Sequence, residues 1–342
     1  MDKFQKFNAS NILVCRTDKI GDVILTLPVV NALKEFYGAK ITFLASEYTA
    51  EILEGHRAID EVMLYKPDEN VFQLAKRIKQ KNFDLAVVVF PIFKVALALW
   101  LARVPVRVGT GYRFFSLFFN KKVFEHRKYA EKHEVEYNLN LIRALGVEVK
   151  EIKFDIFIPN YAFENVQKLL IENGLNNESY IVVHPGSKGS ARDLKPEKFR
   201  ELVKKLSEEG FKIILTGSKS EKQLVHFVGN GLKNVYDLAG LLNLKELSAL
   251  IKNASLFISN STGPIHVASA LGTPVIGFYP PIKVMSPRRW GPYTANRIIF
   301  IPNVPFECKK CIGEKCKFFD CMDLINIDDV VKAIKEKIKV DA

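Results

Sequence analysis

The chain has 342 residues, of which 48% are hydrophobic and 26% are charged, and it contains 25 Phe and 11 Tyr. This composition excludes a disordered or collagen-like chain, and at about 100–200 residues per domain the length predicts two domains. The longest apolar stretch, Val95–Ala102, is shorter than the roughly 18 residues of a membrane span. No secretion signal precedes the first apolar run at Ile12. We therefore expect a cytoplasmic protein, or one that associates peripherally with the inner face of a membrane.

The net charge of +12 is concentrated in two short blocks. Residues 103–132 hold eight basic residues against two acidic ones, and residues 281–317 hold the same balance. Such blocks attract polyanions, which include nucleic acid, anionic lipid and phosphorylated substrates. Either block taken alone is equally well explained as a solvated basic face.

In the first half, short β-rich runs alternate with longer amphipathic segments. The predicted buried strands are Asn11–Cys15, Ile41–Ala45, Glu61–Tyr65 and Leu85–Phe90. The segments between them, such as Ile24–Tyr37 and Val71–Lys81, have helical periodicity. This βαβ pattern is typical of a parallel sheet with helices on both faces. A strand-like run, Phe154–Asn160, closes this half.

The second half repeats the pattern after a predicted helix at Tyr161–Asn173. The predicted strands are Tyr180–His184, Phe211–Thr216, Leu256–Ser259 and Pro274–Tyr279, and the further helices begin near Lys195, Ser220, Asn243 and Thr262. We therefore expect an α/β protein with two Rossmann-like doubly wound domains, 1–158 and 159–325, facing across a cleft. A C-terminal helix at 326–342 could pack back on the first domain.

The first chemical motif, RTDKIGDVILTLP, runs from Arg16 to Pro28 and follows the first predicted strand. Gly21 at the strand-to-helix turn lets a ligand approach the backbone, and free N–H groups at a helix start attract anions. Asp22 lies in the first turn of the helix. Taken alone, it fits a carboxylate that stabilises the helix dipole better than a catalytic one.

Two loops of the second half suit a nucleotide. The loop HPGSKGSAR carries Ser187, Ser190 and Arg192 between a strand and a helix, a composition that favours phosphate or pyrophosphate. After the next strand, Glu221 lies at a helix start. There it could accept hydrogen bonds from ribose hydroxyls or cap the helix.

A third loop, SNSTGPIH at residues 259–266, precedes a helix of small residues. A proline near the first helical position and the small residues behind it let this helix N-terminus approach a ligand closely. His266 shares the turn with Ser261, Thr262 and Gly263. A functional and a structural role for this histidine are equally open.

Taken in order, these motifs resemble glycosyltransferase family 9, the ADP-heptose:lipopolysaccharide heptosyltransferases of Gram-negative bacteria. The resemblance rests on RTD, GDV and TLP in the first half, and on HPGS, SAR, SNSTGPIH and GTP in the second. It continues in RWGPY at 289–293 and covers about residues 10–325. It implies a GT-B fold whose N-terminal domain binds the acceptor and whose C-terminal domain binds the nucleotide sugar.

The resemblance also implies an inverting enzyme that uses no catalytic metal and needs no cofactor. Asp22 matches the catalytic base, which takes a proton from the acceptor hydroxyl as that oxygen attacks the anomeric carbon. The matches to the nucleotide-sugar site are Ser187, Ser190 and Arg192 at the diphosphate, Glu221 at the ribose, and Thr262, Gly263 and His266 beneath the leaving phosphates. Oriented N–H groups and Arg192 would stabilise the departing ADP in place of a divalent ion.

One position departs from the family pattern, because many relatives carry aspartate where this chain has Ser261. We keep Ser261 in the expected nucleotide-sugar site. The leading hypothesis is transfer of heptose from ADP-heptose to an inner-core lipopolysaccharide acceptor built on Kdo and lipid A. The alternative is a family-9 enzyme with a different nucleotide sugar or glycan acceptor.

The acceptor would meet the basic block at 103–132 and the segment HEVEY at 133–137, which also looks like a family element. We expect Lys19, Arg113 and His133 to contact an anionic glycolipid there. The alternative is that HEVEY is simply the start of a surface helix. Peripheral contact with the inner membrane fits the same charge.

Four cysteines follow within 14 residues, at Cys308, Cys311, Cys316 and Cys321, while Cys15 lies in the first predicted strand. Thiols this close usually indicate a metal or disulfides, and an intracellular chain argues against disulfides. The spacing does not repeat a standard C-x2-C pair, so we treat the cluster as a structural staple that could hold zinc.

Two other functional classes fit the sequence less well. A nucleic-acid-binding protein would explain the charge, but helix-turn-helix, zinc-finger and RNP patterns are missing, so we expect no nucleic-acid partner. An NAD-dependent oxidoreductase would share the fold class, but the turn after the first strand has one glycine where a dinucleotide fingerprint has three.

Overall fold

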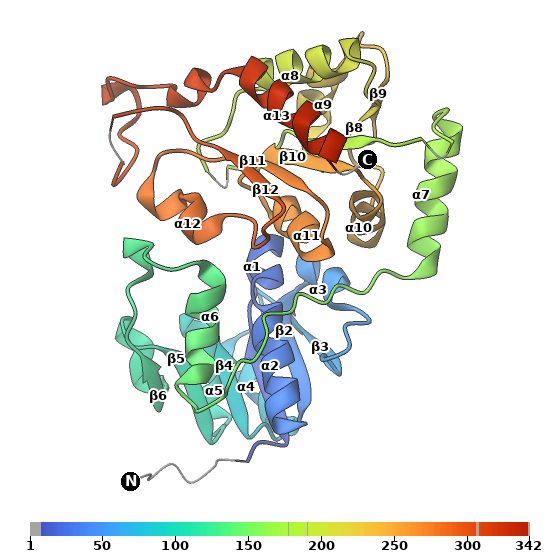
Figure 1. Cartoon of the computed structure of the whole chain (residues 1–342). Coiled ribbons are helices and arrows are strands. Elements are labelled where there is room, and N and C mark those ends of the chain that lie inside the picture. Colours follow the sequence, from blue (N-terminus) through green and yellow to red (C-terminus); the bar gives the residue numbers. More distant parts are fainter. Residues whose placement is uncertain (1–7, 177, 190, 306–307, 341–342) are drawn as a thin grey trace. The chain divides into compact units, whose positions relative to one another are not determined.

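The computed structural model describes residues 8–176, 178–189, 191–305 and 308–340. The chain divides into two compact units, one formed by residues up to 127 together with 132–157, the other by 128–131 and the residues from 158 onward. Each is built on one six-stranded parallel sheet (Figure 1). The predicted fold class, an α/β protein with two Rossmann-like doubly wound units, is confirmed. Within the described ranges, no helix combines the length and the apolarity needed to cross a bilayer.

The first unit alternates strands and helices along the chain. Its elements are β1 Asn11–Cys15, α1 Ile20–Ile24, α2 Leu27–Tyr37, β2 Lys40–Ser46, α3 Glu47–Leu53, β3 Glu61–Tyr65, α4 Val71–Gln80, β4 Leu85–Val88, α5 Phe93–Leu101, β5 Val106–Thr110, the 3-10 helix η1 Phe114–Phe118, β6 Lys121–Val123, the 3-10 helix η2 Arg127–Tyr129, which lies at the division between the units, and α6 Glu134–Arg143.

The strand order of the first sheet is β3-β2-β1-β4-β5-β6. The central strands β1 and β4 are short runs of aliphatic residues that are buried on both faces, as expected for a parallel sheet covered by helices. The chain moves outward in one direction from β1 and then returns to its other side at β4. In such sheets, ligands bind at the carboxyl ends of the strands, at this switch point.

The second unit follows the same plan. Its elements are α7 Asn160–Glu172, β7 Ile181–His184, α8 Pro196–Glu208, β8 Ile213–Leu215, η3 Lys219–Glu221, α9 Lys222–Gly229, β9 Val235–Asp237, α10 Leu244–Lys252, β10 Leu256–Asn260, α11 Gly263–Leu271, β11 Val275–Phe278, η4 Lys283–Met285, α12 Pro287–Trp290, β12 Arg297–Phe300, η5 Gly313–Lys315, η6 Cys321–Leu324 and α13 Ile327–Val340. The strand order is β12-β11-β10-β7-β8-β9, with the switch point between β7 and β10.

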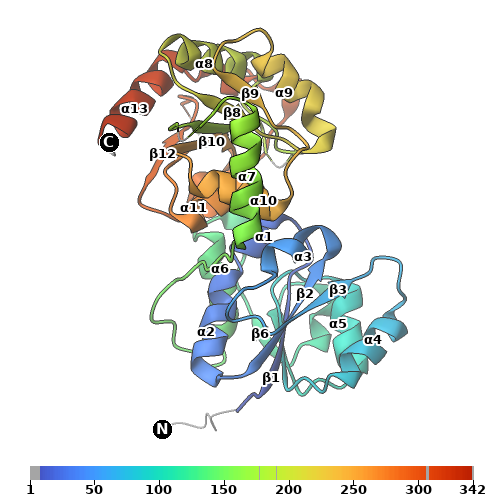
Figure 2. The same cartoon turned by 90° about the vertical axis from the view of Figure 1, so that its right-hand side faces the viewer.

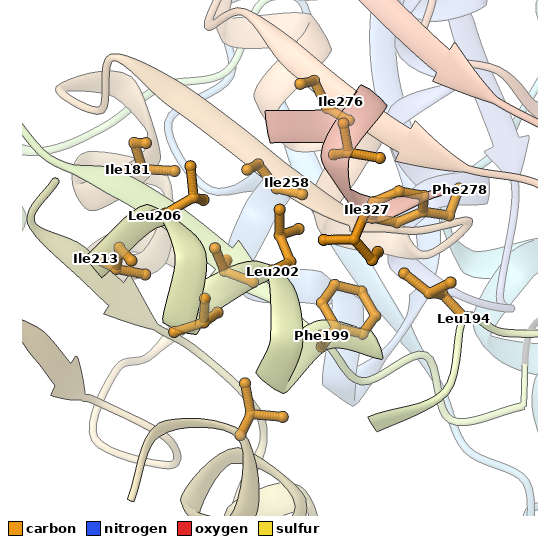
Figure 3. Close-up of a cluster of buried hydrophobic side chains, with 14 of the residues drawn as sticks. Ile181, Leu194, Phe199, Leu202, Leu206, Ile213, Ile258, Ile276, Phe278 and Ile327 are labelled. Atoms are coloured by element: carbon orange, nitrogen blue, oxygen red, sulfur yellow. The ribbon is translucent and has the colours of Figure 1, made fainter. Parts of the chain in front are cut away.

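The core of the second unit explains the position of its C-terminal helix. Side chains of β7, β8 and β10 pack against those of α8 and α13, among them Ile181, Ile213, Ile258, Phe199, Leu202 and Ile327 (Figure 3). The views also show α13 beside α8 and α7 along α10 (Figure 2). The C-terminal helix, for which packing on the first domain was considered from the sequence, packs on α8 of the second unit, because its apolar face completes this core.

Two predicted segments differ in the structure. The expected helix Ile24–Tyr37 is interrupted: α1 ends at Ile24 and α2 begins at Leu27, since Pro28 near the first turn of α2 has no N–H to continue the preceding helix. The strand-like run Phe154–Asn160 is not part of either sheet. Its Phe157 ring instead lies against Gly55, where a Cβ would approach it to 2.1 Å.

Candidate active site

The carboxyl edge of the first sheet carries a cluster of buried charges. Arg16 follows β1 and is only 3% exposed, while Asp22 in α1 is 15% exposed. The Arg16 guanidinium donates from Nη2 to Asp22 Oδ1, and from Nε to Asp18 Oδ1 at 2.7 Å. Its carbon Cζ lies 5.7 Å from the centre of the Phe90 ring, just after β4. The guanidinium therefore sits at the switch point of the sheet and fixes one oxygen of Asp22.

Glu134 joins the same cluster from the start of α6. Its carboxylate is 1% exposed, and its Oε1 lies 3.5 Å from Arg16 Nη1. The same oxygen accepts a hydrogen bond from Arg127 Nη1. A buried carboxylate requires such partners, since leaving one unpaired costs several kcal/mol. Glu134 therefore holds two guanidinium groups close to each other and links α6 to the loop after β1.

Burial and the surrounding charges together set the protonation of Asp22. Burial raises the pKa of the Asp22 carboxyl to about 6, the Arg16 guanidinium opposes this rise, and the carboxylates of Asp18 and Glu134 add to it. Within the described ranges, its second oxygen, Oδ2, has no hydrogen-bond donor. Asp22 thus combines one oriented oxygen with one available oxygen and a pKa near neutrality, which are the properties of a general base.

The three residues expected at the acceptor all lie in the first unit. Lys19 is exposed and precedes α1, and Arg113 is exposed and precedes η1. His133 caps α6, because its Nδ1 accepts from the backbone N–H of Val135 at 3.2 Å. One ring nitrogen of His133 therefore has a structural role that the sequence did not reveal.

In the second unit, a neutral histidine at the end of β7 connects this strand to the loop after β8. His184 Nδ1 lies 3.0 Å from Thr216 Oγ1 of the neighbouring loop. Burial lowers the pKa of His184 to about 4, against the raising effect of Glu221, so the imidazole is uncharged at pH 7. Further along, Ser187 donates its hydroxyl to Asp193 Oδ2 and accepts from the N–H of Gly189 at 3.2 Å. Ser190 lies outside the described residues.

Glu221 lies close to this loop through a glycine. A Cβ built on Gly186 would be 2.1 Å from Glu221 Oε1, so only glycine leaves room for the carboxylate. Oε2 of Glu221 accepts from the N–H and the hydroxyl of Ser218, at 2.8 and 2.6 Å. Although burial opposes ionisation, these two hydrogen bonds keep the pKa of Glu221 below its ordinary value. The predicted ribose ligand is therefore a capping residue as well, and an ionised one.

Asn260 is the residue that sequence reasoning missed. It is fully buried at the end of β10, where its Oδ1 accepts from Leu194 N at 2.9 Å and its Nδ2 donates to Pro185 O at 3.0 Å. It thereby joins the loop after β7, the segment before α8 and the loop after β10. A polar residue closing an aliphatic strand, LFISN, was the one signal available.

The third loop brings its predicted residues to the start of α11. Thr262 is the residue before the helix, Gly263 is the first helical residue, and His266 lies one turn later with 5% of its surface exposed. Ser261 is 9% exposed, and its hydroxyl is hydrogen-bonded to that of Tyr279. The Tyr279 hydroxyl in turn donates to Trp290 O at 2.9 Å. The position that departs from the family pattern is therefore a neutral, fixed hydroxyl.

Arg192, the cation expected at the diphosphate, is oriented by an acidic segment. Its Nη2 donates to Asp320 Oδ1 at 2.5 Å, and its guanidinium lies 4.7 Å from the centre of the Phe319 ring. Lys195 Nζ donates to Asp320 at 2.9 Å and to Asp323 at 2.7 Å. One edge of the Arg192 guanidinium is thus used within the protein, which leaves donors on the other side for an anion.

The four clustered cysteines surround a small pocket that Arg192 and Asp320 also line. All four are free thiols, as is the buried Cys15. Burial raises the pKa of Cys308 and of Cys321, and the neighbouring cysteines raise it further. No group of three or more Cys, His, Asp or Glu side chains in the described part of the chain is arranged to hold a metal ion. Zinc binding at this cluster stays a prediction.

Comparison with known proteins identifies the family. The family model described as glycosyltransferase family 9 (heptosyltransferase) matches residues 71–321. A Haemophilus influenzae protein that is only provisionally named a glycosyltransferase is 33% identical, over 94% of this chain and 95% of its own. Lipopolysaccharide heptosyltransferase 3 of Escherichia coli is 28% identical, over 82% of this chain and 85% of its own.

A solved structure extends the likeness to three dimensions. The ADP-heptose LPS heptosyltransferase II of E. coli superposes with a TM-score of 0.80 at 20% identity, covering 97% of this chain and 99% of that one. At this identity the likeness concerns the fold, while the family match and the sequence relatives concern the chemistry. The chain therefore belongs to glycosyltransferase family 9, the heptosyltransferase family, and is a glycosyltransferase.

Proposed function

We propose that this enzyme transfers heptose from ADP-heptose to an inner-core lipopolysaccharide acceptor, with inversion at the anomeric carbon and without a catalytic metal ion. The observation that carries the proposal is the state of Asp22, a largely buried carboxylate with one oxygen fixed by Arg16 and a pKa of about 6. The names of the relatives, which include lipopolysaccharide heptosyltransferases and an ADP-heptose enzyme, support the choice of substrates.

In the proposed reaction, Asp22 accepts the proton of the acceptor hydroxyl while that oxygen forms a bond to the anomeric carbon of heptose. The bond between this carbon and the β-phosphate oxygen breaks, and its electron pair leaves with ADP. The proton on Asp22 then passes to water. A base with a pKa of about 6 is ionised at pH 7 yet close enough to neutrality to transfer protons efficiently.

The donor is proposed to bind at the carboxyl edge of the second sheet. Its diphosphate would meet the N-terminus of α11 at Thr262 and Gly263, the Ser187 turn and the open side of Arg192. Glu221 would accept from the ribose hydroxyls with the oxygen that Ser218 does not use. Asn260 holds these loops in one arrangement, so their donors need no reorganisation when negative charge develops on the phosphates.

Metal independence is tested separately from substrate choice. Because fixed N–H groups and Arg192 supply the positive potential, we expect turnover to be unchanged after dialysis against EDTA. A loss that Mg²⁺ or Mn²⁺ restores would contradict this part of the proposal. Metal analysis of the enzyme before dialysis, with Cys308→Ser as control, tests zinc at the cysteine cluster.

A family-9 enzyme with another nucleotide sugar remains the second candidate, and Ser261 is the observation that favours it. Its hydroxyl is fixed by Tyr279 and carries no charge. Compared with the aspartate of many relatives, an uncharged residue at this point of the loop would make different contacts with the donor sugar or the adenosine.

The acceptor is proposed to be an anionic glycolipid that meets Lys19, Arg113 and the start of α6 in the first unit, on the cytoplasmic face of the inner membrane. These two cations are exposed, and the surrounding block at 103–132 has eight basic residues against two acidic ones. Such a surface attracts the phosphates and carboxylates of a lipid-linked sugar core.

One assay tests donor and acceptor together. Purified enzyme is incubated with ADP-heptose, ADP-glucose, UDP-glucose or GDP-mannose and with defined Kdo–lipid A acceptors, and the product is identified by mass spectrometry and NMR. We expect one heptose to be added from ADP-heptose, with its anomeric configuration inverted. Transfer from another donor in preference to ADP-heptose would establish the second candidate.

A further inference from the structure

One face of the first unit exposes a ridge of large apolar side chains. Phe114 is 79% exposed, Leu117 66%, Trp100 50% and Phe93 44%. They come from α5 and η1, which pack on each other near β5 and the edge strand β6 of the sheet (Figure 1). We call Phe93, Trp100, Phe114, Leu117 and Phe118 the aromatic ridge. Soluble surfaces rarely expose so many large apolar groups together, and such patches mark interaction sites.

The ridge is a packed structure and not a loose loop. The Phe93 ring centre lies 5.6 Å from that of Phe114 and 6.1 Å from that of Phe118, which in turn lies 5.7 Å from the Trp100 ring centre. Arg107 fixes the same segment from inside, since its Nε donates to the carbonyl of Phe118 at 2.7 Å. The exposed rings are therefore held in place before any partner arrives.

Four cations accompany the ridge in the sequence and remain available. Arg103 follows α5, Arg113 precedes η1, and Lys121 and Lys122 form the edge strand that follows it. All four are exposed, and the described residues offer none of them an ion-pair partner. Cations left without partners beside exposed aromatic rings form a surface that combines an apolar and an electrostatic signal.

We propose that the aromatic ridge and these four cations dock the enzyme on a bilayer that contains anionic lipid. Aromatic rings are favoured at the level of the headgroups, and Lys and Arg beside them are attracted by the negative surface potential. Apolar insertion or electrostatic attraction alone gives weak membrane binding, whereas the two together give stable peripheral association. This deepens the proposed function and rests on it, since it names the surface that brings the enzyme to a lipid-borne acceptor.

The positive charge of this surface favours an anionic bilayer over a second copy of the chain as its partner. A twofold interface would place the same patch against itself, so that the four cations of one copy would face those of the other. An anionic bilayer instead complements them. Single-stranded nucleic acid also combines stacking and positive charge, and it becomes an outcome of the test.

Vesicle co-sedimentation of the full-length enzyme tests the proposal. The vesicles are phosphatidylcholine alone, or phosphatidylcholine with phosphatidylglycerol. We expect binding to the second kind only, weakened by salt because exposed charges are screened. Phe114→Ser with Leu117→Ser, and separately Lys121→Gln with Lys122→Gln, are each expected to reduce the fraction bound by about tenfold. Ile171→Ser, which changes a residue that is 50% exposed on α7 of the other unit, serves as the matched control.

Activity measurements keep this proposal distinct from the proposed function. The variant that combines Phe114→Ser with Leu117→Ser should retain wild-type turnover on a soluble, lipid-free acceptor and lose it on acceptor embedded in vesicles. Thermal melting checks that the variants fold. Unchanged vesicle binding by both variants would overturn the docking surface, as would loss of dimers by the ridge variant in size-exclusion chromatography, or tighter binding of a DNA oligomer than of vesicles. Absence of any heptose transfer would instead contradict the proposed function and leave vesicle binding as measured.

Discussion

The carboxyl edges of the two sheets have the same topology and different chemistry. The edge of the first sheet gathers ionised groups, with Arg16 in contact with Asp18, Asp22 and Glu134. The edge of the second combines hydroxyls, backbone N–H groups, the neutral His184 and the amide of Asn260 with the ionised Glu221 and Arg192. In the proposed function, the first edge moves a proton and the second receives an anion. The fold supplies the place, and the few residues after each strand decide the chemistry.

The largest expected effect comes from removing the proton acceptor. Asp22→Asn keeps the shape of the side chain but removes its basicity, so kcat should fall by about 10²–10⁴-fold, while ADP binding measured by calorimetry should be unchanged. Asp18→Asn is the matched control, because Asp18 also accepts a hydrogen bond from Arg16. It should lose less than about tenfold in kcat. A larger loss for Asp18→Asn than for Asp22→Asn would move the base to the neighbouring carboxylate.

At the second edge, the largest effect is expected at Asn260. Asn260→Ala leaves the buried Leu194 N–H and the Pro185 carbonyl without their partners, which should lower the free energy of unfolding by about 2–4 kcal/mol. Denaturant titration measures this change. The nucleotide affinity of the folded fraction should fall as well, whereas equal affinity would show that the loops keep their arrangement without this amide.

A smaller effect is expected where Glu221 approaches the loop after β7. Gly186→Ala would place a Cβ 2.1 Å from Glu221 Oε1 and displace the carboxylate from Ser218, so KM for the donor should rise by about tenfold, which is about 1.4 kcal/mol. A double-mutant cycle with Glu221→Ala checks the cause. In that background Gly186→Ala should add nothing, and an undiminished effect would show that the loop itself is disturbed.

The smallest effect is expected for Glu134, at the carboxyl edge of the first sheet. The Glu134 carboxylate raises the pKa of Asp22, so Glu134→Gln should lower it and shift the acid limb of kcat/KM toward lower pH. Without the Glu134 carboxylate, the Arg16 guanidinium would also interact more strongly with Asp22 and would further stabilise its ionised form. The pH profile of the variant measures this shift. A limb that stays in place, or moves upward, would contradict the electrostatic link between Glu134 and Asp22.

The sequence was sufficient for the parts of the site that are local. Ser187 and Thr262 each lie three residues after a predicted strand, and Asp22 lies in the first turn of the helix that follows one, at the edge where a parallel sheet binds its ligands. It was not sufficient for contacts between distant segments. Glu134 lies more than one hundred residues from Arg16 in the chain and pairs with it only because α6 reaches the end of β1.

The features of the fold that the sequence left undetermined have a similar origin. The run Phe154–Asn160 has the composition of a strand but joins neither sheet, because pairing depends on which edges the other strands leave available. The C-terminal helix has an amphipathic pattern that does not specify which core it completes. In the sequence, the segment that carries the aromatic ridge was recognised only as a basic block. The exposure of its rings could not be predicted, because it depends on how η1 packs on α5.

The central claim is that burial, together with the charges of the first edge, keeps Asp22 as a base with a pKa of about 6. The measurement that tests it most directly is the pH dependence of kcat/KM for heptose transfer by the wild-type enzyme, since this quantity reports the ionisation of the free enzyme. Because the carboxylate must be unprotonated to accept a proton, activity should fall below an apparent pKa of about 6. A rate that stays constant down to the ordinary pKa of an aspartate, about 4, would contradict the account.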